Sequence, residues 1–198
     1  MKQSLEETAR RFDEMADDYD ESSTEWLTRA QQVVLEVSHP KAGERAIDLG
    51  TGTGVLAKGL ASRLKEVIAI DISIRMLEKV DARNLPNVRT LMASFDDFES
   101  KISEKADLVV SNFAMHHLDQ IGKGKAMESI ASVLSPKGRF VLGDLMIFEE
   151  TTLYDGLFDP EVDDPAPVSF LEETLQTLGF SVTTKKLHPI VGVILAER

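Results

Sequence analysis

The sequence contains no cysteine, although it is 198 residues long. This absence excludes disulfide bonds, thiol nucleophiles and metal sites with cysteine ligands, and a reducing cytoplasmic location is expected. No apolar run approaches the length of about 18 residues that a membrane-spanning helix needs, so no membrane contact of that kind is expected. The first residues are polar and charged, and they lack the apolar region of a secretion signal.

Basic residues are also scarce. The chain has 22 Lys and Arg against 34 Asp and Glu, which gives a formal net charge of −12. Proteins that bind nucleic acid or anionic membranes usually present a basic surface, so neither partner is expected here. The hydrophobic content of 42% is typical of a packed domain, and the length favours a single one.

The first 40 residues have apolar side chains at helical spacing, which predicts two helices. The apolar face of the first comprises Leu5, Ala9, Phe12, Met15, Ala16 and Tyr19. The second helix is expected at about residues 24–37. A break at residues 39–43 ends this part of the chain.

Beyond residue 44, short apolar strands alternate with helical patterns, which predicts a mainly parallel sheet. The strands are expected at about residues 45–49, 66–71, 88–92, 106–111 and 139–145. The helices are expected at about residues 55–64, 73–80, 121–134 and 169–178. Two further strand-like runs, 180–187 and 190–196, are joined by only His188 and Pro189, so they must form an antiparallel hairpin.

A turn rich in glycine follows the first strand, with the sequence Gly50-Thr51-Gly52-Thr53-Gly54. Glycines at this place let the backbone turn sharply and approach a ligand, and the next helix directs its free N–H groups to the same point. The second strand ends in Asp71. An acid about 20 residues beyond such a turn can accept hydrogen bonds from ribose hydroxyls. The pattern therefore predicts a nucleoside site.

Two other nucleotide sites fit this turn poorly. A nicotinamide-dependent oxidoreductase would have G-x-G-x-x-G, but Val55 stands where the last glycine belongs. The expected C-terminal hairpin also argues against that class. No Gly-Lys-Ser/Thr follows, so a phosphate-binding P-loop is excluded. A Gly-Thr-Gly-Thr-Gly turn after Ile-Asp-Leu is instead typical of S-adenosylmethionine sites.

With these motifs the chain resembles class I S-adenosylmethionine-dependent methyltransferases of the small-molecule, ubiquinone-biosynthesis-like type. The similar segments are residues 11–20, 46–54, 70–73, 112–118 and 134–140. The resemblance implies an α/β, Rossmann-like three-layer sandwich. Its seven-stranded sheet would have the order 3-2-1-4-5-7-6, with strand 7 antiparallel. Residues 1–40 would form an N-terminal helical lid and residues 41–198 the cofactor-binding domain.

The resemblance also implies the cofactor, S-adenosylmethionine, and its product S-adenosylhomocysteine. The implied cofactor-binding residues are Asp48, Gly50, Gly52, Gly54, Asp71, Ile72, Ser94, Phe95, Asn112 and Tyr19. Asp48 would support the methionine amino group, Asp71 the ribose hydroxyls and Ile72 the adenine. Asn112, with the following Phe113, would flank the methionine end.

One position departs from the family pattern. Ser94 stands where the family often has an aspartate that accepts a hydrogen bond from the adenine amino group. Serine can accept the same bond without the charge, which would weaken adenine binding. Asp96 or Asp97 would take this role if the register shifts, and Phe95 would lie near the ring.

Methyl transfer from a sulfonium is a direct displacement, so the enzyme mainly aligns the reactants and excludes water. A general base is needed only if the acceptor must lose a proton. The candidates are His116, Tyr19 and Asp144. His116 and His117 have no third ligand at a metal-binding spacing in the sequence, so no metal site is expected.

The distribution of charge indicates the class of acceptor. Residues 1–26 hold nine acidic and three basic residues, and residues 140–184 hold ten acidic and no basic ones. If both segments border the substrate entrance, a small neutral or amine-containing acceptor is favoured. The loop at residues 149–168 would cover the acceptor side. A solvated acidic surface, a protein or other macromolecular acceptor, and a non-catalytic S-adenosylmethionine-binding module are the alternatives. The oligomeric state, monomer or homodimer, is left open.

Overall fold

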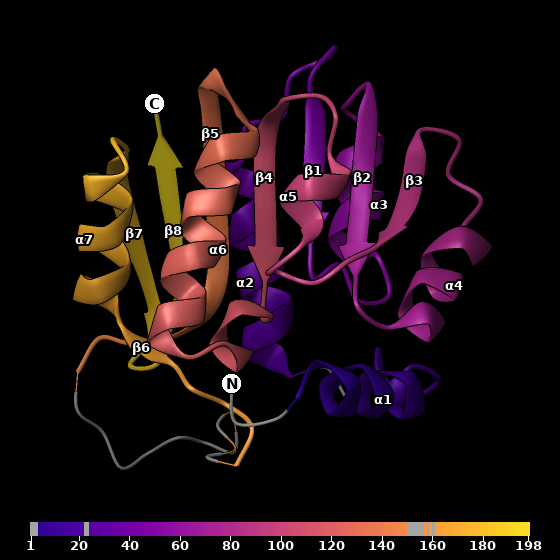
Figure 1. The fold of residues 1–198 in the computed structure, drawn as a ribbon, viewed down its shortest axis with the longest axis horizontal. Helices are drawn as coiled ribbons and strands as arrows, with labels where there is room; N and C mark the ends of the chain where they lie inside the picture. The colour runs from indigo at the N-terminus through magenta and orange to yellow at the C-terminus, as the bar shows by residue number, and fades with distance from the viewer. Residues whose placement is uncertain (1–3, 22–23, 150–156, 158, 160) are drawn as a thin grey trace.

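The computed structural model describes residues 4–21, 24–149, 157, 159 and 161–198, and it shows a central β-sheet between two layers of helices (Figure 1). The elements in chain order are α1 (Leu5–Met15), α2 (Glu25–Val37), β1 (Arg45–Leu49), α3 (Val55–Ala61), β2 (Glu66–Asp71), α4 (Ile74–Ala82), β3 (Val88–Met92), α5 (Phe98–Lys101), β4 (Ala106–Asn112), the 3-10 helix η1 (Met115–His117), α6 (Gln120–Val133), β5 (Leu134–Ile147), β6 (Ala166–Pro167), α7 (Val168–Thr177), β7 (Ser181–His188) and β8 (Val191–Glu197).

The sheet has the predicted topology. Its strands lie in the order β3-β2-β1-β4-β5-β8-β7, and β8 is antiparallel to both neighbours, β5 and β7. The pairs among β1 to β5 are parallel. The two-residue β6, which pairs with β5, is an addition to the expected seven strands. The α/β fold class, the strand order and the C-terminal hairpin are therefore confirmed.

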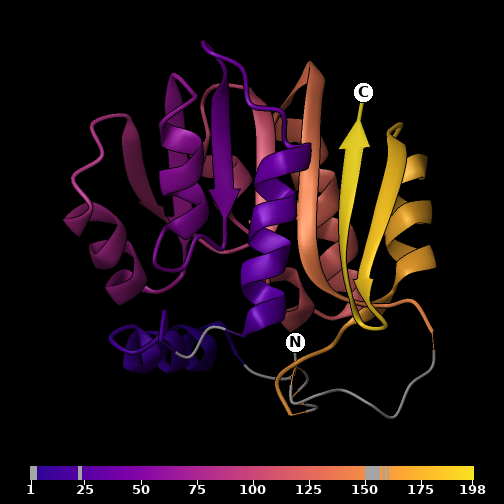
Figure 2. The ribbon, with the colours of Figure 1, turned by 180° about the vertical axis from the view of Figure 1, so that it is seen from behind.

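Successive side chains along the central strands point to opposite faces of the sheet, so a core forms on each face. In β4, Val109 faces one core, whereas Leu108 and Val110 face the other. Helices α5, α6 and α7 supply side chains to the first core, and α2, α3 and α4 to the second (Figure 2). Such period-two alternation is the pattern of a sheet with both faces covered.

The two N-terminal helices differ in their packing. Helix α2 buries Ala30, Val33 and Val34 against the sheet, whereas α1 has no buried residue. Helix α1 lies across the carboxyl ends of the strands (Figure 1). The prediction that the helical face continues to Tyr19 is wrong, because α1 ends at Met15 and Tyr19 follows in a turn. Acidic residues such as Asp17 and Asp18 are unfavourable at the negative end of a helix dipole, and α1 has no basic residue in its last turn.

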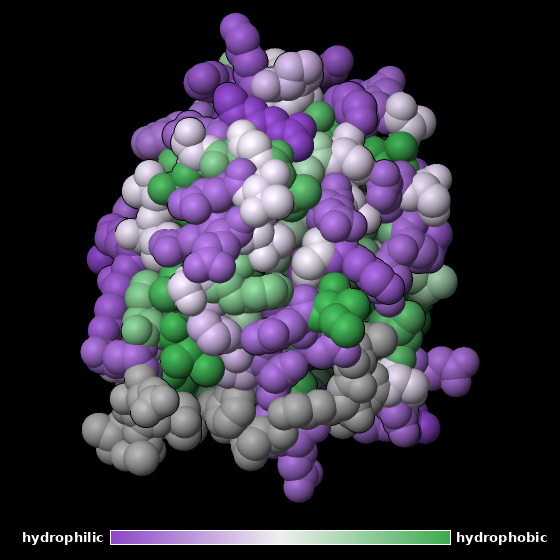
Figure 3. Space-filling model, turned by 60° about the vertical axis from the view of Figure 1, so that its left-hand side comes forward, coloured by the Kyte–Doolittle hydropathy of each residue, from purple (hydrophilic) through white to green (hydrophobic). Residues whose placement is uncertain are grey.

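Polar and apolar side chains are interspersed on the side of the molecule that carries α7 and β7 (Figure 3). In the part of the chain that is described, none of the helices has the length and apolar character needed to cross a membrane.

Candidate active site

A first cavity opens at the carboxyl ends of β1, β2 and β4, beside α1. It is lined by Leu5, Thr8, Phe12, Tyr19, Leu49, Gly50, Gly52, Asp71, Ile72, Met76, Ala93, Ser94, Phe95, Asp96, Phe113, Ala114, His117 and Leu118. Ligands of open parallel sheets bind at this edge, since the loops there leave a crevice and expose helix N-termini.

The glycine turn forms one wall of the first cavity. Gly50, Gly52 and Gly54 all have positive φ, at 73°, 53° and 82°. The backbone N–H groups of Gly50 and Thr51 both donate to the carbonyl of Ile70, at 2.9 Å, which ties the turn to the end of β2. A Cβ atom on Gly50 would lie 2.5 Å from the Cβ of Ala114. The turn therefore requires glycine at residue 50 for both conformation and space.

Asp71 lies at the end of β2 with its carboxylate facing the turn. One oxygen accepts a hydrogen bond from the N–H of Gly52 at 2.8 Å, and the other accepts from the N–H of Ser73 at 3.0 Å. Burial raises the pKa of Asp71, although these backbone donors act in the opposite direction. A carboxylate has about four acceptor positions, so this one can also accept from two ribose hydroxyls.

Asp48 lies beneath the turn, only 1% exposed. Burial raises the pKa of this carboxyl to about 7, although the Thr51 hydroxyl and the backbone N–H of Ala57 lower it. The Thr51 hydroxyl donates to it at 2.7 Å. A cationic amino group bound nearby would stabilise the ionised form of Asp48 and so lower its raised pKa. Both carboxylates thus fit S-adenosylmethionine, with its ribose diol and its ammonium group.

Seven of the predicted cofactor residues line the first cavity: Tyr19, Gly50, Gly52, Asp71, Ile72, Ser94 and Phe95. The other three, Asp48, Gly54 and Asn112, are not part of its lining. Gly54 begins α3 beside Val80, and Asn112 directs its side-chain oxygen toward Gly143. That oxygen is buried without a hydrogen-bond partner.

Asp96 and Asp97, in the segment after β3, differ in their access to the first cavity. Asp97 accepts from the N–H of Ser94 at 2.7 Å and pairs with Lys101 at 2.6 Å, outside the cavity lining. Asp96 and Ser94 both line the cavity. Of the two acids considered for the adenine amino group, Asp96 is therefore the one with access to it.

A second cavity adjoins the first. It is lined by Arg11, Phe12, Met15, Tyr19, Thr24, Leu27, Phe113, His116, His117, Leu157 and Asp163. Phe12, Tyr19, Phe113 and His117 line both cavities. These side chains form the boundary across which two ligands would meet.

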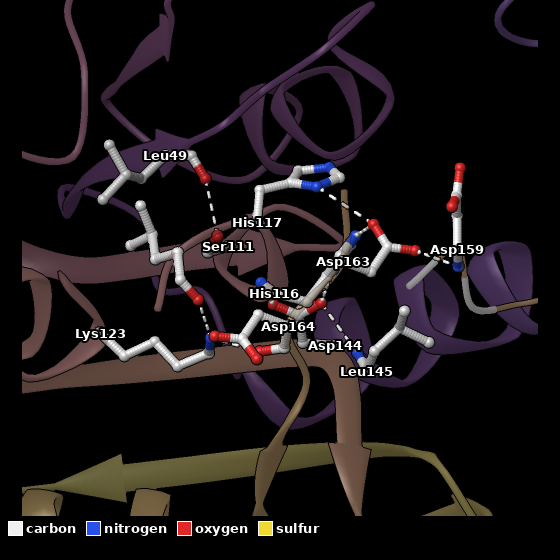
Figure 4. A network of polar contacts seen from close by, with 11 residues as sticks. Leu49, Ser111, His116, His117, Lys123, Asp144, Leu145, Asp159, Asp163 and Asp164 are labelled. Carbon is white, nitrogen blue, oxygen red and sulfur yellow. Dashed lines mark hydrogen bonds and ion pairs between the residues drawn. The ribbon is translucent and has the colours of Figure 1, made fainter. Parts of the chain in front are cut away.

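A network of histidine and aspartate side chains forms one wall of the second cavity (Figure 4). The Nδ1 atom of His116 lies 2.5 Å from Asp144, which also accepts from the backbone N–H groups of His116 and Leu145. On its other side, the Nε2 atom of His116 lies 3.5 Å from Asp163. The Nδ1 atom of His117 lies 3.2 Å from the same oxygen of Asp163.

The electrostatics of this network favour a neutral His117. Burial and the neighbouring His116 lower the pKa of His117, although Asp163 and Asp144 act in the opposite direction. Burial would raise the pKa of Asp163, but His117, His116 and the backbone N–H of Asp159 outweigh it, so the pKa is lowered. The site thus combines a neutral imidazole with an ionised carboxylate.

Asp163 was not among the site residues predicted from sequence. It is 46 residues beyond His117, and the intervening chain passes through α6 and β5, so no local spacing reveals the contact. The expectation of no metal site depended on the lack of a third ligand. The structure removes that reason, because His116, His117 and Asp163 each offer a ligand atom within 4.8 Å of the others.

The three catalytic candidates occupy different positions. Tyr19 and His116 line the second cavity, whereas Asp144 lies behind His116 and is 1% exposed. Asp144 can orient His116 but does not line either cavity. Burial, together with Asp71, Asp20 and Asp144, raises the pKa of Tyr19 to about 12. Tyr19 therefore keeps its proton near neutral pH.

Acidic residues attach α1 and the turn after it to α4 and the glycine turn. Asp13 accepts from the Ser73 hydroxyl at 2.6 Å. Asp17 pairs with Arg75 at 3.0 Å and with Lys79 at 2.6 Å. Asp20 accepts from the Thr53 hydroxyl at 2.6 Å. Three of the nine acidic residues at positions 1–26 thus connect this N-terminal segment to α4 and the glycine turn.

Comparison with known proteins agrees with this site. A family model described as a methyltransferase domain matches residues 46–138. An uncharacterized methyltransferase of Oceanobacillus iheyensis is 30% identical, over 94% of this chain and 95% of that protein. Another, of Exiguobacterium sibiricum, is 27% identical over 94% of this chain and 95% of that protein.

Among solved structures, a complex of DhpI with SAM and HEP has a similar fold. Its TM-score is 0.80 at 20% identity, over 98% of this chain and 97% of that one. The fold, the glycine turn and Asp71 agree with the family that these relatives show. The chain belongs to the class I S-adenosylmethionine-dependent methyltransferases.

Proposed function

We propose that this methyltransferase acts on a small acceptor, neutral or amine-containing, held in the second cavity. The observation that carries the proposal is the shared boundary of the two cavities at Phe12, Tyr19, Phe113 and His117. A donor in the first cavity and an acceptor in the second would meet there. S-adenosylmethionine supplies the methyl group on a positively charged sulfur.

In the proposed arrangement, the glycine turn and Asp71 would hold the ribose, and Asp48 would support the amino group from below. Asp96 or Ser94 would accept from the adenine amino group. The aromatic side chains at the boundary would fix the line of approach and exclude water, which are the main tasks in a direct displacement. The cofactor roles of Gly54 and Asn112 stay predictions.

The lining of the second cavity supports the acceptor class. Phe12, Tyr19 and Phe113 offer aromatic faces, which attract amines as cations and pack against neutral rings. Asp163 offers a carboxylate, and among the described residues of the lining Arg11 is the one lysine or arginine. A neutral amine attacks with its own electron pair, whereas an amine bound as a cation would first release a proton to solvent. A hydroxyl acceptor would release its proton toward the wall formed by His116, His117 and Asp163.

A small acceptor also agrees with the position of α1. Leu5 and Thr8 of α1 line the first cavity, and Arg11, Phe12 and Met15 line the second. We infer that α1 acts as the lid, whereas α2, which is packed in the helical layer, belongs to the main body. A cytoplasmic location stays a prediction.

The test is a turnover screen that measures S-adenosylhomocysteine production with paired acceptors. Each pair consists of an amine or alcohol and the carboxylate or phosphate of the same carbon skeleton. We expect turnover of the amine or alcohol and little of the anionic partner. A consistent preference for the anionic partners would refute the proposed acceptor class, and turnover of a protein but of no small molecule would refute the proposed size.

A further inference from the structure

Three side chains on the wall of the second cavity, His116, His117 and Asp163, direct nitrogen and oxygen atoms toward one another. Asp144 is buried and approaches the Nδ1 atom of His116 at 2.5 Å. It also accepts from the backbone N–H of Leu145 at 2.8 Å. These contacts fix the orientation of the His116 ring, whose Nε2 atom is directed toward Asp163.

The group opposite His116 is the carboxylate of Asp163. Asp163 is 6% exposed, and its other oxygen accepts from the backbone N–H of Asp159 at 2.8 Å. The oxygen that faces the histidines lies 3.5 Å from Nε2 of His116 and 3.2 Å from Nδ1 of His117. Two imidazole nitrogens and a carboxylate oxygen thus converge in a buried position, and groups of this kind bind metal ions.

Two of the three separations in the cluster match those of metal ligands, and the set as a whole, within 4.8 Å, would contract slightly around a bound ion. For bond lengths of about 2.0–2.1 Å to nitrogen or oxygen, tetrahedral ligand atoms are about 3.3 Å apart. Asp163 lies 3.5 Å from His116 Nε2 and 3.2 Å from His117 Nδ1. Contact between a carboxylate and the other nitrogen of a ligating histidine, as between Asp144 and His116, is the usual outer shell of such a site.

We propose that His116, His117 and Asp163 bind one divalent transition-metal ion, with zinc-like chemistry, on the wall of the second cavity. Imidazole and carboxylate donors suit Zn²⁺ and its neighbours rather than Mg²⁺. Three protein ligands leave a coordination position for water or substrate, which is the arrangement of reactive rather than structural sites. That position would face the cavity lining.

The metal site extends the proposed function. It rests on that function only for the identity of the group that would occupy the open coordination position. A hydroxyl or amine acceptor could bind there directly, which would orient it toward the boundary with the first cavity. For a hydroxyl, coordination would also favour loss of its proton to solvent before the oxygen–methyl bond forms and the sulfur–carbon bond breaks. Without a metal ion, the close approach of His117 and Asp163 would instead be a hydrogen bond between their side chains.

The experiment is calorimetric titration of tag-free, chelator-treated full-length protein with ZnCl₂ and, separately, with MgCl₂. We expect one Zn²⁺ per chain and no saturable Mg²⁺ binding. Asp163→Asn should weaken Zn²⁺ binding by about tenfold or more, by analogy with the loss of other groups around a metal. Asp163 does not line the first cavity, so S-adenosylhomocysteine binding by this variant checks its folding.

Two control variants lie at exposed positions outside the cluster, Asp18→Asn and His39→Asn. Asparagine is chosen at residue 39 because His39 has φ of 42°. Both should bind Zn²⁺ like the wild type. Co²⁺ added to the wild type should produce visible absorption bands of a site with fewer than six ligands, a readout that needs no variant.

Absence of stoichiometric Zn²⁺ binding, or equal binding by the wild type and Asp163→Asn, would overturn the metal site. Such a result would leave the proposed acceptor class untouched, because turnover is measured separately. Conversely, failure of every small acceptor with intact Zn²⁺ binding would refute the acceptor proposal alone.

Discussion

The two cavities share a wall but are built in different ways. The first is made mainly of short continuous segments that follow β1, β2 and β3, each fixed by backbone hydrogen bonds. The second combines side chains from α1, the start of α2, η1 and residue 163. The first cavity is thus determined by local sequence, whereas the second depends on tertiary assembly. Within this family, such a division would let the cofactor site stay constant while the acceptor site varies.

The largest effect expected on the first-cavity side is a pH dependence of stability that arises from Asp48. Burial raises its pKa from 3.8 to about 7, so the folded state holds a proton that the unfolded chain has lost. The free energy of unfolding should therefore fall as pH rises through this window, by about 4 kcal/mol in total.

Denaturant unfolding of the cofactor-free protein between pH 4 and 8 measures this dependence. The difference between wild type and Asp48→Asn isolates the residue, because Asn does not titrate. Asp18→Asn, at an exposed position, should keep the wild-type slope. Parallel curves for wild type and Asp48→Asn would contradict the assignment.

The next effect concerns the glycine turn. Gly50→Ala should destabilise the protein by about 3 kcal/mol, because alanine is strained at positive φ and its Cβ overlaps Ala114. This corresponds to a fall in Tm of about 6–12 °C for a chain of this size. Gly124→Ala, within α6 and with open space around its Cβ, is the matched control. It should raise Tm slightly, and equal losses in both variants would argue against the close packing of the turn.

A smaller effect is expected at the boundary between the cavities. Because the pKa of Tyr19 is raised to about 12, this side chain should not act as a base near neutral pH. Tyr19→Phe should lower kcat by less than about tenfold, since loss of a general base costs about 100-fold or more. The pH dependence of kcat should keep its shape. A 1,000-fold loss would assign Tyr19 a catalytic proton.

The smallest effect is expected where α1 contacts α4. Asp17 pairs with Arg75 and Lys79, but its side chain is 63% exposed. Exposed ion pairs contribute little, so Asp17→Asn should change cofactor affinity by less than about threefold. Added salt should reduce even that difference, and Asp18→Asn serves as its neighbour control. A loss of more than tenfold would mean that α1 is held mainly by this pair.

The parts of the molecule that sequence predicted well are those determined by local patterns. The short apolar runs of β1 and β4 and the C-terminal hairpin all follow from neighbours in sequence. The start of β5 was missed, because the strand begins at Leu134 and its pairing with β4 shifts between Ala106 and Leu108. Such irregular pairing depends on the neighbouring strand.

The acceptor side was less predictable for the same reason. Asp163 reaches His116 and His117 only after α6, β5 and the following segment have folded, so no motif contains all three. Tyr19 was expected on a helix, and it reaches the boundary of both cavities from a turn instead. In the loop expected at residues 149–168 to cover the acceptor side, residues 150–156, 158 and 160 lie outside the described residues.

The most direct test of the division between the two cavities is calorimetric titration of S-adenosylhomocysteine into wild type, Asp71→Asn and Asp163→Asn. Asp71→Asn should weaken binding about 100-fold, since it would lose two charge-assisted hydrogen bonds of about 1.5 kcal/mol each. Asp163→Asn should bind within about threefold of wild type, because it lies outside the first cavity. Equal losses in both variants, or undiminished binding by Asp71→Asn, would contradict the account.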